Sequence, residues 1–232
     1  MPDLFDNIKD KPQKKNAPSP TTVNNSKKER SYSAKDIEVL EGLEPVRLRP
    51  GMYIGGTDDR AVHHLVAEIL DNSMDEAVAG EASHIDLEIN AEQYVTISDN
   101  GRGIPVDPHP KFKDKSAVEV ILTTLHSGGK FSGSSYETSG GLHGVGLSVV
   151  NALSDHLTVE IARDKKIWTQ RYERGKPVTK LENTGKTSNR RGTVVKFHPD
   201  PKIFGDKVQF RPSTLYKMAR SKAYLFKGVE IR

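Results

Sequence analysis

The chain of 232 residues contains no cysteine. Disulfide scaffolds, thiolate metal sites and cysteine nucleophiles are therefore excluded, and the composition fits a reducing compartment. No apolar run approaches the roughly 18 residues that a membrane-spanning helix needs, and the first residues lack the basic-then-apolar pattern of a signal peptide. Aromatic residues are few, and Trp168 and the seven tyrosines are not interleaved with a basic run. We expect a cytoplasmic protein without membrane contact.

The net charge of +4 is concentrated at the N-terminus. Residues 1–30 hold seven Lys or Arg and four Asp or Glu, whereas residues 31–232 hold 28 and 27, a net charge of +1. The first segment has few apolar residues after Ile8, so it cannot bury enough surface to offset the entropy of ordering. We expect residues 1–30 to be a disordered basic tail and residues 31–232 to be the folded domain. A nearly balanced domain gives no electrostatic argument for nucleic acid, so a DNA-binding alternative depends on the tail.

Apolar spacing predicts the first elements. Residues 61–79 read as a helix because Val62, Leu65, Val66 and Ile69 fall on one side, and Gly80 suits the position just past a helix end. Residues 85–89 and 95–97 alternate between apolar and polar, which indicates a β-hairpin with one buried face.

The remaining pattern is a mixture of helices and strands. Ser116 and Glu119 form a capping box before an apolar helix that ends near Leu125. A further buried helix is expected over residues 145–153, and strands are expected over 157–161, 167–171, 193–197 and 224–231. This order indicates an α+β sandwich and lacks the regular alternation of a Rossmann fold.

Glycine is concentrated where a ligand could approach the backbone. Nine of the 19 glycines lie between Gly101 and Gly146. The segment 139–146 precedes a predicted helix, an arrangement that suits a phosphate group; a flexible surface loop is the alternative. The spacing matches neither the P-loop nor the Rossmann fingerprint.

Two acidic positions are candidates for chemistry. Glu68 and Asn72 are one helical turn apart, and a carboxylate beside a neutral oxygen donor suits Mg²⁺ together with an activated water. A solvated helix face is the alternative, but residues 68–76 contain no Lys or Arg. Asp99 ends a strand, where a buried carboxylate could accept a hydrogen bond from an adenine amine; a turn residue is the alternative.

These segments together resemble a known superfamily. Four sets of residues are involved: Glu68 with Asn72, Asp99 with Gly101 and Gly103, Gly141 with Gly144 and Gly146, and Gly192 with Thr193. They resemble the four ATP-binding boxes of the GHKL superfamily. This superfamily contains type II topoisomerases, heat-shock chaperones, mismatch-repair ATPases and sensor histidine kinases. The stretches 49–55, 71–77, 125–131 and 139–153 are similar to bacterial type II topoisomerase B subunits. Residues 37–46 and 106–112 look more like topoisomerase IV than like gyrase.

The resemblance covers about residues 31–232 and implies a fold and a set of roles. The fold is the two-layer α+β sandwich of this superfamily, with a mixed, mainly antiparallel sheet and helices on one face. Glu68 would be the general base, Asn72 the Mg²⁺ ligand, and Asp99 the acceptor of the adenine amine, helped by Thr193 through a water. The adenine side would be lined by Arg102, Gly103, Ile104 and Pro105, with Arg102 paired to Glu76. A lid formed by Gly141, Leu142, His143, Gly144, Val145, Gly146 and Leu147 would wrap the phosphates, with Lys130 near its start.

The resemblance also implies partners. Tyr32 would belong to an N-terminal arm that reaches the nucleotide of a second B subunit. Aminocoumarin-type inhibitors would contact Asp99, Arg102, Pro105, Arg163 and Thr193. The family's B subunits dimerise on ATP binding, join an A subunit in a heterotetramer and act on DNA. Their transducer and DNA-cleavage domains would follow Arg232, so we expect this chain to bind ATP and hydrolyse it weakly. Gyrase B, or another GHKL ATPase such as a chaperone or kinase module, is the alternative.

Overall fold

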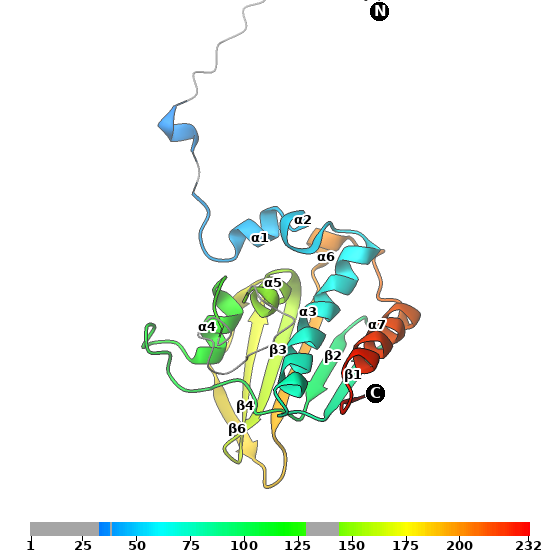
Figure 1. Cartoon of the computed structure of the whole chain (residues 1–232). Coiled ribbons are helices and arrows are strands. Elements are labelled where there is room, and N and C mark those ends of the chain that lie inside the picture. Colours follow the sequence, from blue (N-terminus) through cyan, green and yellow to red (C-terminus); the bar gives the residue numbers. More distant parts are fainter. Residues whose placement is uncertain (1–32, 38, 129–143) are drawn as a thin grey trace, which may run out of the picture. The chain divides into compact units, whose positions relative to one another are not determined.

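The computed structural model describes residues 33–37, 39–128 and 144–232, and its contacts divide the chain into two units, residues 1–39 and 40–232 (Figure 1). The described part of the first unit contains the short 3-10 helix η1 (Ala34–Asp36), where the backbone N–H of Ser33 donates to Asp36 Oδ2 (2.7 Å). The tail predicted for residues 1–30 lies outside the described residues. All remaining elements belong to the second unit.

The second unit is built on one eight-stranded sheet. Its strands are β1 (His84–Ile89), β2 (Val95–Asp99), β3 (Ser154–Arg163), β4 (Lys166–Glu173), β5 (Lys176–Pro177), β6 (Glu182–Lys186), β7 (Gly192–Pro199) and β8 (Glu230–Ile231). They run in the order β5-β4-β3-β7-β2-β1-β8, and β6 also pairs with β4. The β1–β8 pair is parallel and the other pairs are antiparallel, which confirms the predicted mixed, mainly antiparallel sheet.

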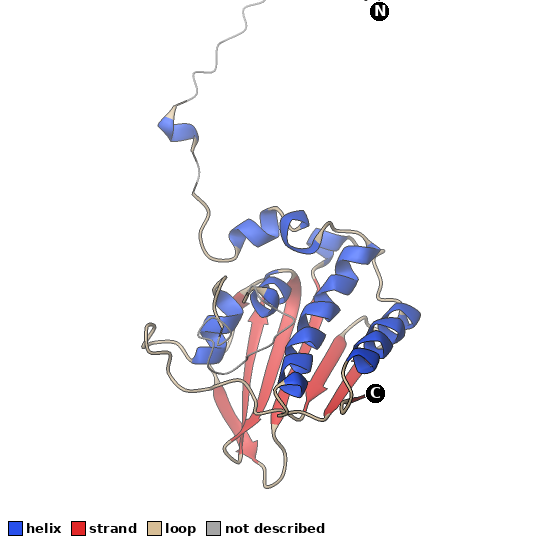
Figure 2. Ribbon diagram, in the orientation of Figure 1, coloured by secondary structure: helices blue, strands red, loops and turns tan. Residues whose placement is uncertain are grey.

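Helices cover one face of this sheet (Figure 2). They are α1 (Glu44–Leu48), α2 (Gly51–Ile54), α3 (Asp59–Val78), α4 (Ala117–Thr123), α5 (Gly146–Ala152), α6 (Pro201–Phe204) and α7 (Pro212–Leu225). In β3, Leu157, Val159 and Ile161 are buried, whereas Thr158 and Glu160 between them are partly exposed, as expected for a sheet with one open face. The α+β two-layer prediction is confirmed.

Helix α3 carries the acidic residues of the segment 68–76. Asp58 caps it by accepting hydrogen bonds from the backbone N–H groups of Arg60 and Ala61 (3.0 Å each), so α3 begins two residues earlier than predicted. Gly80, just past its end, has the positive φ of +76° that favours glycine. Leu65 and Leu70 are fully buried in the core.

The carboxylate of Asp200 links several elements of the fold. Asp200 caps α6 by accepting from the N–H of Lys202 (3.0 Å), and its Oδ2 also accepts from Arg47 (2.6 Å) and Arg174 (3.0 Å). Arg47 in turn donates to the carbonyl of Ala152 at the end of α5 (2.5 Å). Burial favours a higher pKa for Asp200, but the hydrogen bonds and the two guanidinium charges together hold it below its ordinary value.

The prediction for the C-terminal residues was wrong. Residues 224–231 were expected to form one strand, but α7 continues to Leu225 and β8 contains only Glu230 and Ile231. The predicted cap of α4 is confirmed, because Ser116 Oγ accepts from the N–H of Glu119 (3.2 Å). No helix among the described residues is long and apolar enough to cross a membrane.

Candidate functional site

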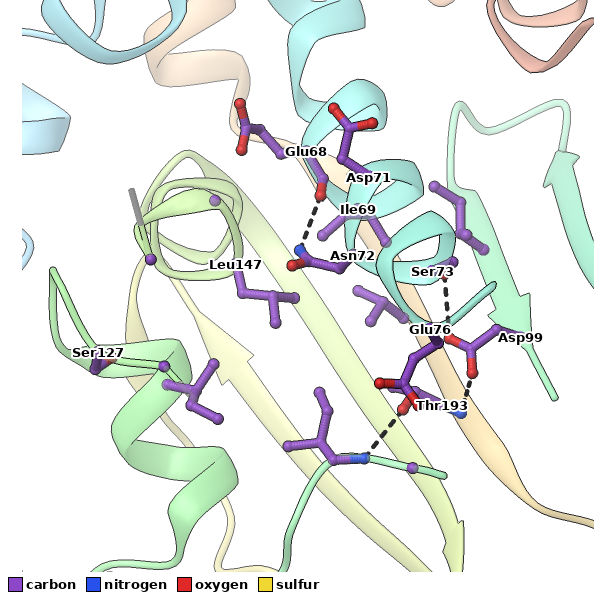
Figure 3. A pocket seen from close by; sticks show the side chains of 18 of the residues that line it. Glu68, Ile69, Asp71, Asn72, Ser73, Glu76, Asp99, Ser127, Leu147 and Thr193 are labelled. Atoms are coloured by element: carbon purple, nitrogen blue, oxygen red, sulfur yellow. Dashed lines mark hydrogen bonds between the residues drawn. The ribbon is translucent and has the colours of Figure 1, made fainter. Parts of the chain in front are cut away.

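A cavity of about 520 Å³ lies between α3, the sheet and the ends of two loops (Figure 3). It brings together every predicted site residue that the structure describes: Glu68, Asn72, Glu76, Asp99, Arg102, Gly103, Ile104, Pro105, Gly144, Val145, Gly146, Leu147, Arg163 and Thr193. Tyr32, Lys130, Gly141, Leu142 and His143 lie outside the described residues. Positions spread over about 125 residues of sequence therefore share one cavity.

The carboxylate of Asp99 is held from three sides. Its Oδ1 accepts from the backbone N–H groups of Gly101 (2.9 Å) and Thr193 (3.3 Å), and its Oδ2 accepts from the hydroxyl of Ser73 (3.1 Å). Burial raises the pKa of Asp99, and the Glu76 carboxylate acts in the same direction, while the three hydrogen bonds oppose the shift. Asp99 is thus a fixed hydrogen-bond acceptor in the cavity wall.

The turn after Asp99 is shaped by an ion pair and by glycine. Both oxygens of Glu76 accept from the Arg102 guanidinium (2.8 and 3.1 Å), and Oε2 also accepts from the backbone N–H of Arg102 (3.0 Å). The predicted pairing of Arg102 with Glu76 is confirmed. Gly103 has a φ of +75°, and a Cβ there would lie 3.1 Å from the carbonyl of Ala162, so a side chain would not fit.

Two further contacts close this end of the cavity. The hydroxyl of Thr193 accepts from the backbone N–H of Ile104 (3.2 Å), and Arg163 donates to the carbonyl of Gly103 (2.7 Å). A Cβ on Gly192 would overlap the carbonyl of Asp99, so glycine is required for β7 to approach β2 here. The pocket floor therefore depends on close backbone packing at both Gly103 and Gly192.

Glu68 and Asn72 lie further along the same face of α3 (Figure 3). Asn72 Nδ2 donates to the main-chain carbonyl of Glu68 (2.8 Å), which fixes the amide so that its oxygen is the atom able to bind a cation. Both residues are partly exposed and line the cavity. The start of α5 packs directly on Glu68, since a Cβ on Gly146 would overlap Glu68 Oε2.

The oxygen donors of the site suit a hard cation that is held mainly by the phosphates of a substrate. Among the described residues, no group of three or more His, Cys, Asp or Glu could enclose a metal. Mg²⁺ commonly binds through one or two protein oxygens plus substrate phosphates. The amide oxygen of Asn72 is therefore suited to binding a cation together with substrate phosphates, and does not form a dedicated protein metal site with the other described residues.

Sequence reasoning missed the apolar walls of the cavity and one hydrogen-bonding residue. Tyr53, Ile69, Ile97, Ile121 and Val195 line it as well. Ser73, which donates to Asp99, was not among the predicted site residues. Its small hydroxyl beside Asn72 was the available signal, but its partner is 26 residues away in the sequence.

Comparisons with known proteins define the class. Residues 57–203 match the family of histidine kinase-, DNA gyrase B- and HSP90-like ATPases. The chain belongs to this ATPase family.

Several similar proteins are the B subunits of type II topoisomerases. The chain is 62% identical over 206 residues to that of DNA topoisomerase 4 from Bartonella bacilliformis, covering 89% of this chain and 30% of that protein. It is 58% identical to the DNA topoisomerase 4 protein of Rickettsia bellii, covering 100% and 33%, and 56% identical to the DNA gyrase protein of Thermotoga maritima, covering 86% and 31%. The chain thus spans about a third of the length of these relatives.

A solved structure gives the same result for the fold. The 43K ATPase domain of Thermus thermophilus gyrase B, in complex with an aminocoumarin, superposes with a TM-score of 0.72 at 45% identity, covering 82% of this chain and 47% of that chain. The fold is therefore that of a gyrase B ATPase domain.

Proposed function

We propose that this chain is the ATP-binding and ATP-hydrolysing part of a topoisomerase IV B subunit. The observation that carries the proposal is the single cavity with Asp99 fixed as an acceptor at one end and Glu68 with Asn72 further along α3. The higher identity to topoisomerase 4 proteins, 62% and 58% against 56% for gyrase B, favours topoisomerase IV. Gyrase B is the alternative.

Each residue has a role that its geometry supports. Asp99 accepts the exocyclic amine of adenine, with Thr193 beside it, and Arg102, Gly103, Ile104 and Pro105 line the base. Glu68 takes the proton of the attacking water as general base. Asn72 holds Mg²⁺, which when bound neutralises charge on the phosphates. The segment 141–147 wraps the phosphates; of it, residues 144–147 line the described cavity, and Lys130 is proposed to stand near its start.

The activity of the whole protein is also a proposal, because the chain spans only about a third of its relatives. We infer that residues 31–232 form the ATPase domain behind a basic tail, 1–30, and that the protein acts in the cytoplasm with an A subunit in a heterotetramer. ATP binding would close a dimer of B subunits, with Tyr32 reaching the partner's nucleotide, and so drive DNA strand passage. Aminocoumarin-type inhibitors would bind at Asp99, Arg102, Pro105, Arg163 and Thr193.

Nucleotide titration tests the proposal. Calorimetry with a non-hydrolysable ATP analogue and Mg²⁺ should give saturable binding to this chain, and the corresponding GTP analogue should bind far more weakly. Guanine presents a carbonyl oxygen where adenine presents an amine, so it would face the Asp99 carboxylate acceptor to acceptor. Equal binding of both analogues, or no binding by the folded chain, would contradict the assignment.

A second experiment separates the two topoisomerases. The full-length protein combined with its A subunit should decatenate linked DNA circles in the presence of ATP without introducing negative supercoils. ATP-dependent supercoiling of relaxed plasmid would assign the protein to gyrase instead.

A further inference from the structure

The charge of the folded part is segregated, although its total is nearly balanced. Residues 160–192 contain ten Lys or Arg and four Asp or Glu, a net charge of +6. The rest of residues 31–232 contains 18 and 23, a net charge of −5. The near-neutral total therefore does not argue against a polyanion-binding surface on this domain.

Five of these cations gather where β3, β4, β6 and β7 meet their connecting turns. We call Lys165, Lys166, Lys186, Arg190 and Arg191 the basic tip. Lys166 and Lys186 are direct cross-strand partners, and the N–H of Thr187 bonds the carbonyl of Lys165 (3.0 Å). All five side chains are exposed. The tip lies at the end of the sheet opposite α6 (Figure 1).

The like charges of the basic tip destabilise the folded sheet. Lys166 of β4 stands directly opposite Lys186 of β6 on one side and Arg163 of β3 on the other, which places three like charges side by side on one face. Like charges directly opposite each other in a sheet are destabilising. Protection of a sheet edge against aggregation explains a lysine such as Lys186. Lys166 lies on a strand paired on both sides, and its ammonium lies 5.7 Å from the centroid of the Trp168 ring.

Among the described residues, the carboxylates near the basic tip pair with arginines. Arg190 pairs with Glu160 (2.6 Å), Arg191 with Glu81 (3.7 Å), and Asp164 with Arg163 (3.7 Å). Lys165, Lys166 and Lys186 form no ion pair with any carboxylate in the part of the chain that the structure describes. Lys166 contacts the Trp168 ring, and all three lysines are exposed to solvent without a carboxylate partner among the described residues.

We propose that the basic tip holds the phosphate backbone of duplex DNA. Lysine contacts to phosphate supply sequence-independent affinity, which is what an enzyme that passes any DNA segment needs. The turns of the tip carry no large apolar residue that could insert into a lipid layer. The choice of DNA among polyanions rests on the proposed function, and the inference deepens it by naming where this domain touches its substrate.

A charge-matched pair of variants tests the inference. The tip variant carries Lys165→Gln, Lys166→Gln and Lys186→Gln. The control carries Lys202→Gln, Lys207→Gln and Lys217→Gln, three exposed lysines on α6, α7 and the loop between them. Both lower the net charge equally and keep the N-terminal tail. Binding of the full chain to fluorescently labelled duplex DNA is measured by anisotropy over a series of salt concentrations.

The tip variant should bind DNA at least about tenfold more weakly at low salt, with a slope of log K against log salt that is smaller by about 2.7 for three phosphate contacts. The control should keep the wild-type slope. Equal losses in both variants, an unchanged slope in the tip variant, or no DNA binding by the wild type would overturn the inference. So would binding to phosphatidylserine vesicles without binding to DNA. Titration of the wild type with the ATP analogue keeps the two proposals distinguishable, because nucleotide binding by the wild type without DNA binding refutes the basic tip alone.

Discussion

Replacing Asp99 by asparagine is the sharpest test of the cavity's chemistry. Oδ1 of Asp99 accepts from two backbone N–H groups, those of Gly101 and Thr193. The amide oxygen of an asparagine would keep both bonds, which leaves its NH₂ group at the position of Oδ2, beside Ser73 and facing the cavity. The substitution therefore preserves the local structure and exchanges an acceptor for a donor where the adenine amine would bind.

The expected loss can be worked out from that exchange. A hydrogen bond to a charged acceptor contributes about 1.5–3 kcal/mol, and leaving opposed donors unsatisfied costs about 1–3 kcal/mol more. Even the lower values together amount to about 2.5 kcal/mol, which is roughly a 60-fold loss of affinity. We therefore expect nucleotide binding to fall by roughly two orders of magnitude.

The same substitution should not weaken the fold. Burial raises the pKa of Asp99 above its ordinary value of 3.8, so the native state holds this proton more tightly than the unfolded chain. The ionised carboxylate then costs stability that increases as pH rises from 3.8 through the folded-state pKa. An asparagine side chain does not ionise, so the melting temperature of the Asp99→Asn variant at neutral pH should equal or exceed that of the wild type.

Calorimetric titration with the non-hydrolysable ATP analogue, combined with thermal unfolding of the same samples, measures both effects. Binding retained within about fivefold would refute the acceptor role, since that corresponds to only about 1 kcal/mol. A large fall in melting temperature would show instead that the three hydrogen bonds require a carboxylate.

Two further predictions concern the rest of the site, and a third concerns the hydrogen bonds of Asp200. In the full-length protein, Glu68→Gln should keep nucleotide binding within a few-fold and lower the hydrolysis rate by about 10²–10⁴, as a coupled ATPase assay would show; normal turnover removes Glu68 from its role. Gly146→Ala should displace the Glu68 carboxylate, which is the end of a flexible side chain, and so lower the hydrolysis rate with little change in the urea midpoint; unchanged hydrolysis would contradict the close contact. Arg47→Met should cost about 1.5–3 kcal/mol by leaving Asp200 with one guanidinium. The folded-state pKa of Asp200 is lowered, so its ionised carboxylate contributes to folding stability above pH 3.8, and this contribution is lost as pH falls through the folded-state pKa. The stability difference between Arg47→Met and wild type should therefore shrink in acid.

Elements with a strong period were predictable from the sequence. Helix α3, the β1–β2 hairpin, α4, α5 and the central strands followed from apolar spacing. Helix α7 was missed because its periodic signal is weak, since Leu215 is its one buried residue. The Pro212 that opens it was a start signal, and Lys222 joins it to α3 through an ion pair with Asp71, a contact that no local pattern reveals.

The polar residues of the site were largely predictable, and the cavity itself was not. Glu68, Asn72 and Asp99 were singled out by residue type and position, and their roles were inferred from the resemblance to the ATP-binding boxes. The apolar walls from Ile97 and Ile121 look like ordinary core positions in the sequence. Only the tertiary structure shows that these side chains border an open space.

The strand order has a consequence for how the protein forms during synthesis. Strand β7 lies between β3 and β2 in the sheet, yet it follows both in the chain. A nascent chain that ends before Gly192 therefore holds two separate antiparallel ribbons, β1–β2 and β3–β4, with no strand to join them. Thr193 and Val195, which floor the cavity, arrive on that joining strand. Because synthesis proceeds from the N-terminus, more than a hundred residues must be added after α3 before the nucleotide-binding cavity is complete.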